Sequence, residues 1–379
     1  MRRDQGERVV VGMSGGVDSS VAALLLKQSG LKVEGVSFIL YEARMKKTFS
    51  KAPCCSIAAM DDARLTAQQI GVTHHTVDMR EVFMEKVIEP FMEAYSRGVT
   101  PNPCILCNKY VKFPYLLSHA RERGAALIST GHYARVQNRK LMKGVDIKKD
   151  QSYVLYVLSQ EELGCLRLPL GGMRKDEVRQ IARGHGLAAA TRPESQEICF
   201  IEERNYCTLF QGLPCAQPGP IIDVATGRVI GEHRGVHLYT VGQRKRLGIA
   251  ALEPRYVAKI DGARNALYVG PREAALAREC EVEDLNWLEP PAALMPNEGM
   301  CSEFRATVKV RSAMRDEPAM IVDAASGRAA SWQRVRVRFD EAQWAPAPGQ
   351  SAVFYDGGRV IGGGVIALPG ASDKKTPAY

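Results

Sequence analysis

The segment Gly12–Ser20, GMSGGVDSS, combines residue types that bind phosphate groups. Gly15 and Gly16 allow the backbone to curl without a Cβ penalty, so consecutive N–H groups and the next helix N-terminus converge on an anion. The serine hydroxyls add donors, but the lysine of a Walker A loop and the spacing of a dinucleotide fingerprint are both missing. We therefore predict a nucleotide-binding loop of another kind. The simpler alternative is a glycine turn with Asp18 or Ser19 as an ordinary helix N-cap.

Cys104, Cys107 and Cys199 are candidates for sulfur chemistry. The first two share a proline-stiffened loop, whereas Cys199 lies far downstream. In a sulfur relay, one thiol carries a persulfide and a second thiol frees the sulfur by forming a disulfide. The nearby cations Lys109 and Lys112, or a helix N-terminus, would lower the pKa of a thiol in that loop. The spacing of the cysteines permits a relay without requiring one.

Two other roles for the cysteines stay open. An isolated C-x2-C pair most often indicates half of a zinc site, but neither a second C-x2-C nor an H-x3-H follows at finger spacing. The adjacent pair Cys54–Cys55 is too tight to act as an ordinary chelating pair. A lone cysteine such as Cys199 is also commonly a small buried apolar residue.

Strands that alternate with helices must position the loop in the first half of the chain. Apolar, β-branched runs predict strands at residues 8–12, 33–40, 74–77 and 125–129, and periodic segments predict helices at 21–28 and 61–71. This alternation indicates an α/β domain with a parallel sheet covered on both faces. The nucleotide loop then lies between the first strand and its helix.

The sequence pattern changes beyond about Tyr206. Helical periodicity largely disappears, and short strand-like runs are broken by glycine and proline: PGPIID, TGRVIGEHRG, ALYVGP, ATVKVRSA, RVRVRF and SAVFYDGGRVIGGG. We predict a catalytic domain over residues 1–205, a central β-rich domain over 206–280 and a C-terminal β-barrel over 281–379. The second boundary falls near Arg278–Asp284, and ASDKKTPAY is expected to be a frayed tail.

Composition limits the class of protein. The chain has 379 residues with 45% hydrophobic content, enough for two or three cores, and its formal net charge of +9 suits a polyanionic partner. Ten cysteines scattered through a long chain are expected to be mostly reduced thiols. No apolar run approaches the ~20 residues that span a bilayer, and Met1–Arg8 lacks a secretory apolar stretch, so we expect a cytoplasmic protein without a membrane partner.

Eight segments, in order along nearly the whole chain, resemble those of the bacterial and organellar tRNA-specific 2-thiouridylases. They are GMSGGVDSSV, CCSIAAMDDARLTAQQIGV, TPNPCILCNKYVKF, TGHYAR, KKDQSYVLY, ESQEICFI, GEHRGVHLYTVGQRKRLGI and PGQSAVFYDGGRVIGGGVI. The first is also similar to the SGGxDS loop of ATP pyrophosphatases, which adenylate a substrate and release pyrophosphate. The resemblance implies an ATP pyrophosphatase domain of the adenine nucleotide alpha hydrolase-like fold, followed by two small β-rich domains.

The resemblance implies an enzyme, a tRNA-uridine 2-sulfurtransferase. ATP would adenylate the C2 carbonyl oxygen of the wobble uridine, which makes AMP the leaving group when sulfur attacks C2. Cys199 would accept persulfide sulfur from a carrier protein, and Cys107 would be the nucleophile that can close a disulfide with it. An anticodon loop offers unstacked bases for such chemistry. Acceptors would be tRNAs for Lys, Glu and Gln, Mg²⁺ would accompany the ATP phosphates, and the protein would be a monomer.

The resemblance also assigns binding residues. The ATP site would comprise Gly12, Met13, Ser14, Gly15, Gly16, Val17, Asp18, Ser19, Phe38 and Gly131. Asn102, Pro103 and Cys104 would face the target base, with further tRNA contacts from His132, Lys149, Asp150, Gln151, Arg311, Ser312 and Gln350. Basic β-rich segments such as RVRVRF would hold the RNA backbone without reading its sequence.

Three positions depart from the family pattern. Cys104 stands where an aspartate with an acid/base role is common, Arg246 where glycine is usual, and Ser312 where tyrosine is usual. As an alternative chemistry, Cys104, Cys107 and Cys199 would hold an iron–sulfur cluster with one iron open for sulfide. Another pyrophosphatase-loop enzyme, such as a lysidine or 4-thiouridine synthetase or an amide-forming ligase, is a second alternative. A non-catalytic RNA-binding module with a metal-braced CxxC loop is a third.

Overall fold

The computed structural model describes residues 6–41, 57–192, 198–200, 209–210, 212–294, 302–324 and 331–369. The chain forms two compact units: residues 1–87, 103–204 and 358–360 make the first, and residues 88–102, 205–357 and 361–379 make the second. The pair Cys54–Cys55, most of the ESQEICFI segment and the tail ASDKKTPAY lie outside the described residues. Within the described ranges, no helix has both the length and the apolar character needed to cross a membrane.

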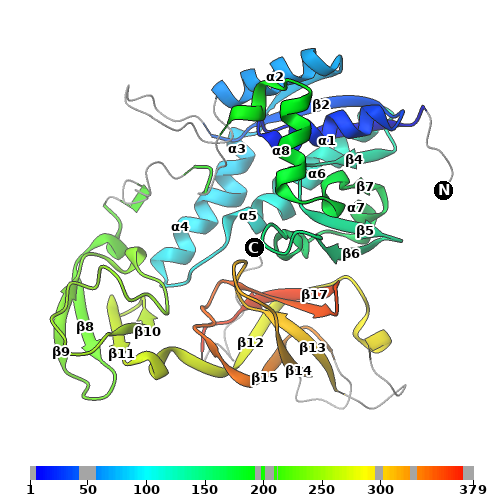
Figure 1. Ribbon diagram of the computed structural model, residues 1–379. Helices are drawn as coiled ribbons and strands as arrows, with labels where there is room; N and C mark the ends of the chain where they lie inside the picture. The colour runs from blue at the N-terminus through cyan, green and yellow to red at the C-terminus, as the bar shows by residue number, and fades with distance from the viewer. Residues whose placement is uncertain are drawn as a thin grey trace. The chain divides into compact units, whose positions relative to one another are not determined.

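The first unit is built on a parallel sheet with the strand order β3-β2-β1-β4-β7 (Figure 1). Its strands are β1 (Arg8–Gly12), β2 (Lys32–Ile39), β3 (Thr73–Asp78), β4 (Leu127–Ser129) and β7 (Leu166–Arg167). Val9, Val10 and Val11 are fully buried because a central parallel strand is covered on both faces. The strand order reverses between β1 and β4, which is where open α/β sheets form their ligand crevice.

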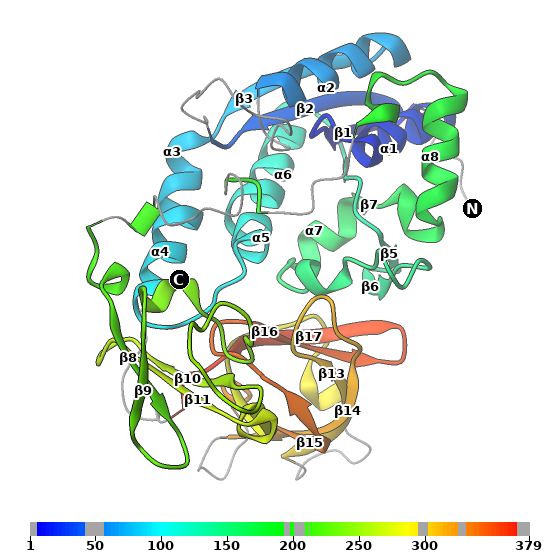
Figure 2. The ribbon, with the colours of Figure 1, turned by 60° about the vertical axis from the view of Figure 1, so that its left-hand side comes forward.

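Helices cover both faces of this sheet (Figure 2). The helices of this unit are α1 (Val17–Gln28), α2 (Ile57–Ile70), α3 (Arg80–Phe83), α5 (Pro103–Leu106), η2 (Cys107–Lys112), α6 (Phe113–Glu122), α7 (Gln160–Cys165) and α8 (Lys175–Gly184). Apolar residues of α1, α2 and α8 share one core with β1, and α6 packs against β1 and β4. The α/β architecture predicted from the alternating pattern is confirmed.

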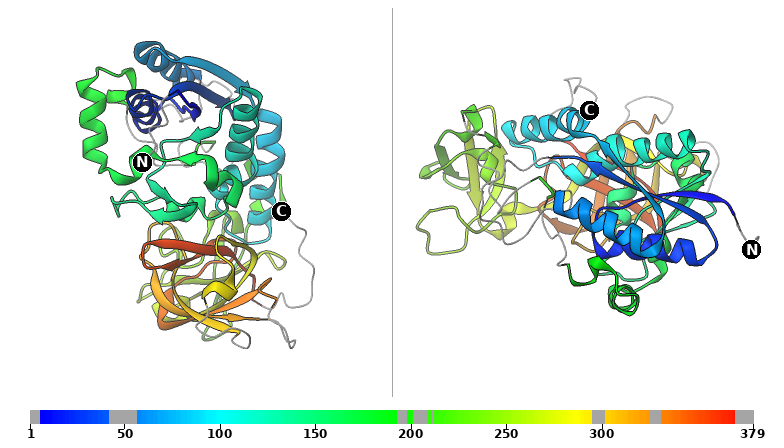
Figure 3. Two further views of the ribbon diagram at one scale, coloured as in Figure 1. Left: turned by 90° about the vertical axis from the view of Figure 1, so that its right-hand side faces the viewer. Right: turned by 90° about the horizontal axis from the view of Figure 1, so that it is seen from above.

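The second unit contains the helix α4 (Glu89–Ser96) and two β-sheets. The smaller sheet has the order β10-β11-β8-β9, formed by β8 (Gly219–Asp223), β9 (Val229–His233), β10 (Tyr256–Asp261) and β11 (Ala266–Gly270). The strands β12 (Leu276–Trp287), β13 (Glu303–Lys309), β14 (Glu317–Asp323), β15 (Val335–Trp344), β16 (Ser351–Asp356) and β17 (Arg359–Ile366) follow. These six strands close into a barrel through pairing of β12 with β17, drawn in yellow to red (Figure 3). Arg278–Asp284, where we place a domain boundary, lies inside β12.

The arginines of the RVRVRF segment face glutamates within the barrel. Arg334 Nε lies 3.4 Å from a Glu281 carboxylate oxygen, and Arg336 Nη2 lies 3.5 Å from the other oxygen of Glu281. Arg338 Nε lies 3.9 Å from the Glu279 carboxylate. Cross-strand pairs of opposite charge stabilise a sheet, each by no more than ~1 kcal/mol at partly exposed positions. The strand is therefore charge-balanced within the barrel, and its predicted role in holding RNA stays a prediction.

Candidate active site

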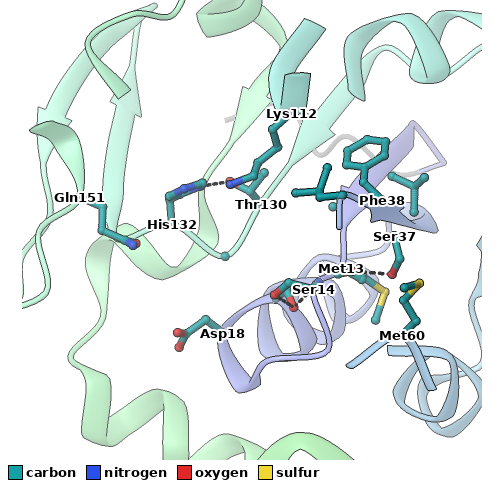
Figure 4. Close-up of a pocket in the computed structure, with 15 residues that line it drawn as sticks. Met13, Ser14, Asp18, Ser37, Phe38, Met60, Lys112, Thr130, His132 and Gln151 are labelled. Atoms are coloured by element: carbon teal, nitrogen blue, oxygen red, sulfur yellow. Dashed lines mark hydrogen bonds between the residues drawn. The ribbon is translucent and has the colours of Figure 1, made fainter. Parts of the chain in front are cut away.

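A pocket in the first unit opens at the carboxyl ends of β1, β2 and β4 (Figure 4). Its lining residues are Gly12, Met13, Ser14, Asp18, Ser19, Val36, Ser37, Phe38, Leu40, Met60, Lys112, Thr130, Gly131, His132 and Gln151. Seven of the ten predicted ATP-site residues are among them, and Gly15, Gly16 and Val17 complete the same loop. Two predicted RNA contacts, His132 and Gln151, line this pocket as well.

The two ends of the pocket differ in chemistry. Phe38 and Met60 lie at one end, with Val36 and Leu40 among the other apolar lining residues. Polar side chains, including Asp18 and Gln151, lie at the opposite end in Figure 4. An apolar surface suits a flat base, and hydroxyl, amide and charged groups suit phosphates. The pocket thus has the polarity that a nucleotide requires.

The glycine-rich loop is held in one conformation by its own hydrogen bonds. Gly15 has a φ of +74°, and a Cβ there would meet the carbonyl oxygen of Ala59 at 1.9 Å. The Ser14 amide donates to Ser19 Oγ at 3.1 Å, and Ser20 Oγ donates to the Gly16 carbonyl at 3.0 Å. Gly16 is the N-cap of α1, without a side-chain cap, so the interpretation of Asp18 or Ser19 as the N-cap is wrong. The first-turn amides of α1 are left to a ligand or to water.

Lys175 is a polar member of the site that the sequence did not indicate. Its Nζ lies 2.6 and 2.7 Å from the two carboxylate oxygens of Asp18, and Tyr133 donates its hydroxyl to Asp18 at 2.7 Å. Asp18 and Lys175 are 157 residues apart in the chain. No local pattern relates them, because the fold alone brings the first turn of α8 to the loop.

His132 is a neutral imidazole at the pocket wall. Its Nδ1 lies 2.7 Å from Thr130 Oγ1, and its ring packs 5.9 Å from the ring of Phe113. Desolvation lowers the pKa of His132 well below its usual value of 6.5, and the positive charge of Lys112 lowers this pKa further. At neutral pH the ring therefore presents one nitrogen that accepts and one that donates a hydrogen bond.

The pH dependence of stability tests this protonation state. We expect the free energy of unfolding to fall as the pH drops below about 6.5, because the unfolded chain then binds a proton that the folded His132 excludes. One such group contributes at most ~1.4 kcal/mol per pH unit. The variant His132→Gln should lose this part of the slope in urea unfolding between pH ~7 and ~5.5. Equal slopes in the variant and the parent protein would contradict the prediction.

A π-helix connects the C-x2-C segment to the pocket. Cys104 is exposed in α5, whereas Cys107 is buried and begins η2. The last residue of η2 is Lys112, which lines the pocket. Lys109 lies over the ring of Tyr110, 5.0 Å from its centroid. π-helical turns are frequent at functional sites, and this one leads directly from a thiol to the pocket.

The segment that contains Cys199 meets the same part of the first unit. Cys199 is half-buried. The next residue, Phe200, packs edge-on against Phe83 with 5.7 Å between ring centroids. Phe83 ends α3, and α3 packs against η2, which begins at Cys107. The segments that carry Cys107 and Cys199, far apart in sequence, therefore both contact α3.

Several predicted RNA contacts also organise the protein's own backbone. Asp150 accepts the Gly144 amide at 2.9 Å. In the second unit, Arg311 donates to the Val241 and Ala345 carbonyls at 2.7 and 3.0 Å, and Gln350 donates to the Thr100 carbonyl at 2.9 Å. Ser312 is exposed, and Lys149 is half-buried. Asn102 belongs to the second unit, whereas Pro103 and Cys104 belong to the first. Their contacts with RNA stay predictions.

Known proteins match this chain over almost its whole length. Family models described as tRNA methyl transferase HUP domain, tRNA methyl transferase PRC-barrel domain and Aminomethyltransferase beta-barrel domain match residues 7–203, 209–271 and 277–366. A protein of Trichormus variabilis named tRNA-specific 2-thiouridylase MnmA is 42% identical over 95% of this chain and 98% of its own length. Proteins of the same name from Geotalea uraniireducens and Halothermothrix orenii are 42% and 40% identical, over 97% and 95% of this chain and 96% and 99% of their own lengths. The chain belongs to the tRNA-specific 2-thiouridylase family.

Proposed function

We propose that this protein is an ATP-dependent tRNA 2-thiouridylase that acts on the wobble uridine. The observation that carries the proposal is the pocket at the GMSGGVDSS loop, joined by the π-helix η2 to the buried thiol of Cys107. The names of the curated relatives support the same reaction. ATP, and not a dinucleotide, fits a loop without the dinucleotide glycine spacing.

In the adenylation step, the C2 oxygen of uridine attacks the α-phosphorus of ATP, and the bond to pyrophosphate breaks. The polar end of the pocket supplies hydrogen-bond donors to the phosphates from the first-turn amides of α1 and from the Ser14 hydroxyl. Lys112, which lines this pocket, stabilises negative charge that develops during transfer. The neutral His132 accepts or donates a hydrogen bond without adding charge.

In the sulfur step, Cys199 carries a persulfide and the Cys107 thiolate attacks the inner sulfur of that persulfide. A Cys107–Cys199 disulfide forms and hydrosulfide leaves. The hydrosulfide attacks C2 of the adenylated uridine, AMP departs with the former C2 oxygen, and 2-thiouridine results. An external thiol then reduces the disulfide for the next cycle. The attachment of both cysteine segments around α3 supports this pairing.

Asp18 is the carboxylate among the described lining residues of the pocket, which makes it the candidate ligand for a magnesium ion that accompanies the nucleotide. Mg²⁺ prefers oxygen ligands, and it is commonly bound by one or two carboxylates together with substrate phosphates. Both oxygens of Asp18 are already bonded to the Lys175 ammonium, and Tyr133 donates to one of them, so the ion would be held mainly by the phosphates. When bound, Mg²⁺ neutralises phosphate charge and orients the pyrophosphate leaving group.

The iron–sulfur alternative receives no support from the described residues. Among them, no three His, Cys, Asp or Glu side chains gather closely enough to hold a metal, and Cys104, Cys107 and Cys199 all belong to that described part. No step of the mechanism is routed through a cluster. Anaerobically purified protein is expected to lack visible iron–sulfur absorbance, and a stoichiometric band would restore the alternative.

The finer assignments belong to the same proposal. The substrates are tRNAs for Lys, Glu and Gln, the sulfur donor is a persulfide carrier protein, and the enzyme acts as a cytoplasmic monomer. Three domains, over residues 1–205, 206–280 and 281–379, divide the work into adenylation and two RNA-holding modules. The chain has 51 Lys and Arg residues and 42 Asp and Glu residues, and the resulting formal net charge of +9 supports an RNA partner.

Pyrophosphate release tests the proposed function. We expect purified protein with ATP and Mg²⁺ to release pyrophosphate when unmodified tRNA is present, and to release far less when it is absent. A non-catalytic RNA-binding module would bind tRNA without releasing pyrophosphate and would contain stoichiometric zinc. A different pyrophosphatase-loop enzyme would release pyrophosphate, but nucleoside mass spectrometry of the tRNA would show no 2-thiouridine.

A further inference from the structure

Lys175, the first residue of α8, fixes the carboxylate of the nucleotide loop. Its ammonium group is bonded to both oxygens of Asp18, and its side chain is only 8% exposed. Tyr133 donates its hydroxyl to the same carboxylate, and the ammonium lies 5.5 Å from the centre of the Tyr133 ring. Charge-assisted hydrogen bonds to both oxygens fix the orientation of the Asp18 carboxylate relative to the pocket.

The backbone of Lys175 is tied to the loop 144–151. One carboxylate oxygen of Asp146 accepts the Lys175 amide at 3.1 Å, and the other accepts the Lys148 amide at 3.1 Å. Asp146 therefore caps the first turn of α8 and shapes its own loop at the same time. Ile147 at the tip of the loop is 85% exposed, so the loop is open to a macromolecular partner.

A second connection reaches Asp18 through Tyr133. The Tyr133 amide donates to the side-chain oxygen of Gln151 at 2.9 Å, and the Gln151 amide donates to the Tyr133 carbonyl at 2.9 Å. The end of the loop therefore holds the backbone of Tyr133, whose hydroxyl is bonded to Asp18. Two separate routes, through Asp146 and through Gln151, join one exposed loop to one carboxylate.

We propose that Lys175 is a positioning residue that couples the loop 144–151 to the nucleotide loop. RNA that orders the loop fixes Asp146, the first turn of α8 and the Lys175 ammonium, and so holds Asp18 in the orientation that nucleotide requires. By linkage, nucleotide must strengthen RNA binding by the same factor. This inference rests on the proposed function, because it takes ATP as the ligand of the pocket and tRNA as the partner of Lys149–Gln151.

The direct test compares nucleotide affinity with and without RNA. The ligand is an ATP analogue with a methylene group between the α- and β-phosphorus atoms, and the RNA is saturating unmodified tRNA. In the parent protein we expect tRNA to tighten nucleotide binding about fivefold or more. Asp146→Ala should bring this ratio close to one. The control Asp176→Ala also removes one negative charge, from an exposed position in the first turn of α8, and should keep the ratio.

Variants of Lys175 separate positioning from folding. Lys175→Met should weaken nucleotide binding and remove the dependence on tRNA, whereas Lys175→Arg keeps the charge and should recover part of both. Hydrogen exchange on the unmutated protein gives a reading that depends on no variant: amides of residues 144–151 should exchange more slowly when the analogue alone is bound. A merely structural lysine would not protect that loop.

Some results would overturn the inference while leaving the proposed function intact. They are an affinity ratio of one in the parent protein that still releases pyrophosphate with tRNA, an unchanged ratio in Asp146→Ala, or unchanged exchange of the loop on binding the analogue. Failure of the parent protein to bind the analogue or to release pyrophosphate would instead defeat the proposed function, and with it the inference.

Discussion

Replacing Cys107 or Cys199 by serine is expected to abolish formation of 2-thiouridine while ATP binding and tRNA-dependent pyrophosphate release persist. A hydroxyl neither carries a persulfide nor attacks one, and residues that act as one unit each cost nearly the whole rate when removed. We expect a loss of about a thousandfold or more in either variant. Nucleoside mass spectrometry of tRNA incubated with ATP and a persulfide donor measures the product.

The chain provides matched controls for this pair. Cys165, at the end of α7, donates its thiol toward the Glu161 and Glu162 carbonyls, and Cys215 is buried in the second unit. Burial raises the pKa of both control thiols, which makes them poor nucleophiles. Serine at either control position should leave thiolation largely intact. Full activity in both the Cys107 and Cys199 variants would eliminate the relay.

Replacing Gly15 by alanine is expected to eliminate nucleotide binding. The φ of +74° disfavours any side chain, and the new Cβ would lie 1.9 Å from the Ala59 carbonyl oxygen in α2. Backbone cannot move aside as a flexible side chain does, so the loop must leave its position. Displacing phosphate-binding amides by about an ångström costs about a hundredfold or more in turnover. Equilibrium binding of the ATP analogue and pyrophosphate release measure the two effects.

Gly16 and Gly184 provide control substitutions for Gly15→Ala. At Gly16 a Cβ would approach only Ser14 Oγ, at an ordinary 3.5 Å, so Gly16→Ala should cost much less than Gly15→Ala. At Gly184, near the end of α8, a Cβ would meet nothing within 4 Å. Gly184→Ala should preserve nucleotide binding and raise helix stability by up to about 1 kcal/mol. Nucleotide binding by Gly15→Ala at parental affinity would show that the loop does not cradle the phosphates.

Local sequence patterns predicted the elements around the pocket well. The predicted strand 8–12 coincides with β1, and the predicted strand 33–40 differs from β2 by one residue at each end. Central parallel strands are continuous apolar runs, so they are visible in sequence. The loop between β1 and α1 has its own chemical signature, and five of its predicted ATP-site residues line the pocket: Gly12, Met13, Ser14, Asp18 and Ser19.

Residues that the fold alone brings together could not be predicted in this way. Lys175 reaches Asp18 across 157 positions, with no pattern that relates the two. The alternating charges of RVRVRF indicated a basic surface, but Glu279, Glu281 and Glu283 on the adjacent strand balance them. β12 does not stand out in the sequence, because glutamates at alternate positions interrupt any apolar run. The same glutamates balance the arginines, so local patterns predict neither the strand nor the charge balance.

The fate of one oxygen atom tests the central claim most directly. Transfer RNA whose wobble uridine carries ¹⁸O at C2 would be incubated with the protein, ATP and a persulfide donor. If the C2 oxygen attacks the α-phosphorus, each 2-thiouridine formed must be matched by one AMP that carries ¹⁸O. Thiolated tRNA accompanied by unlabelled AMP would contradict adenylation at this oxygen and, with it, the proposed use of the pocket.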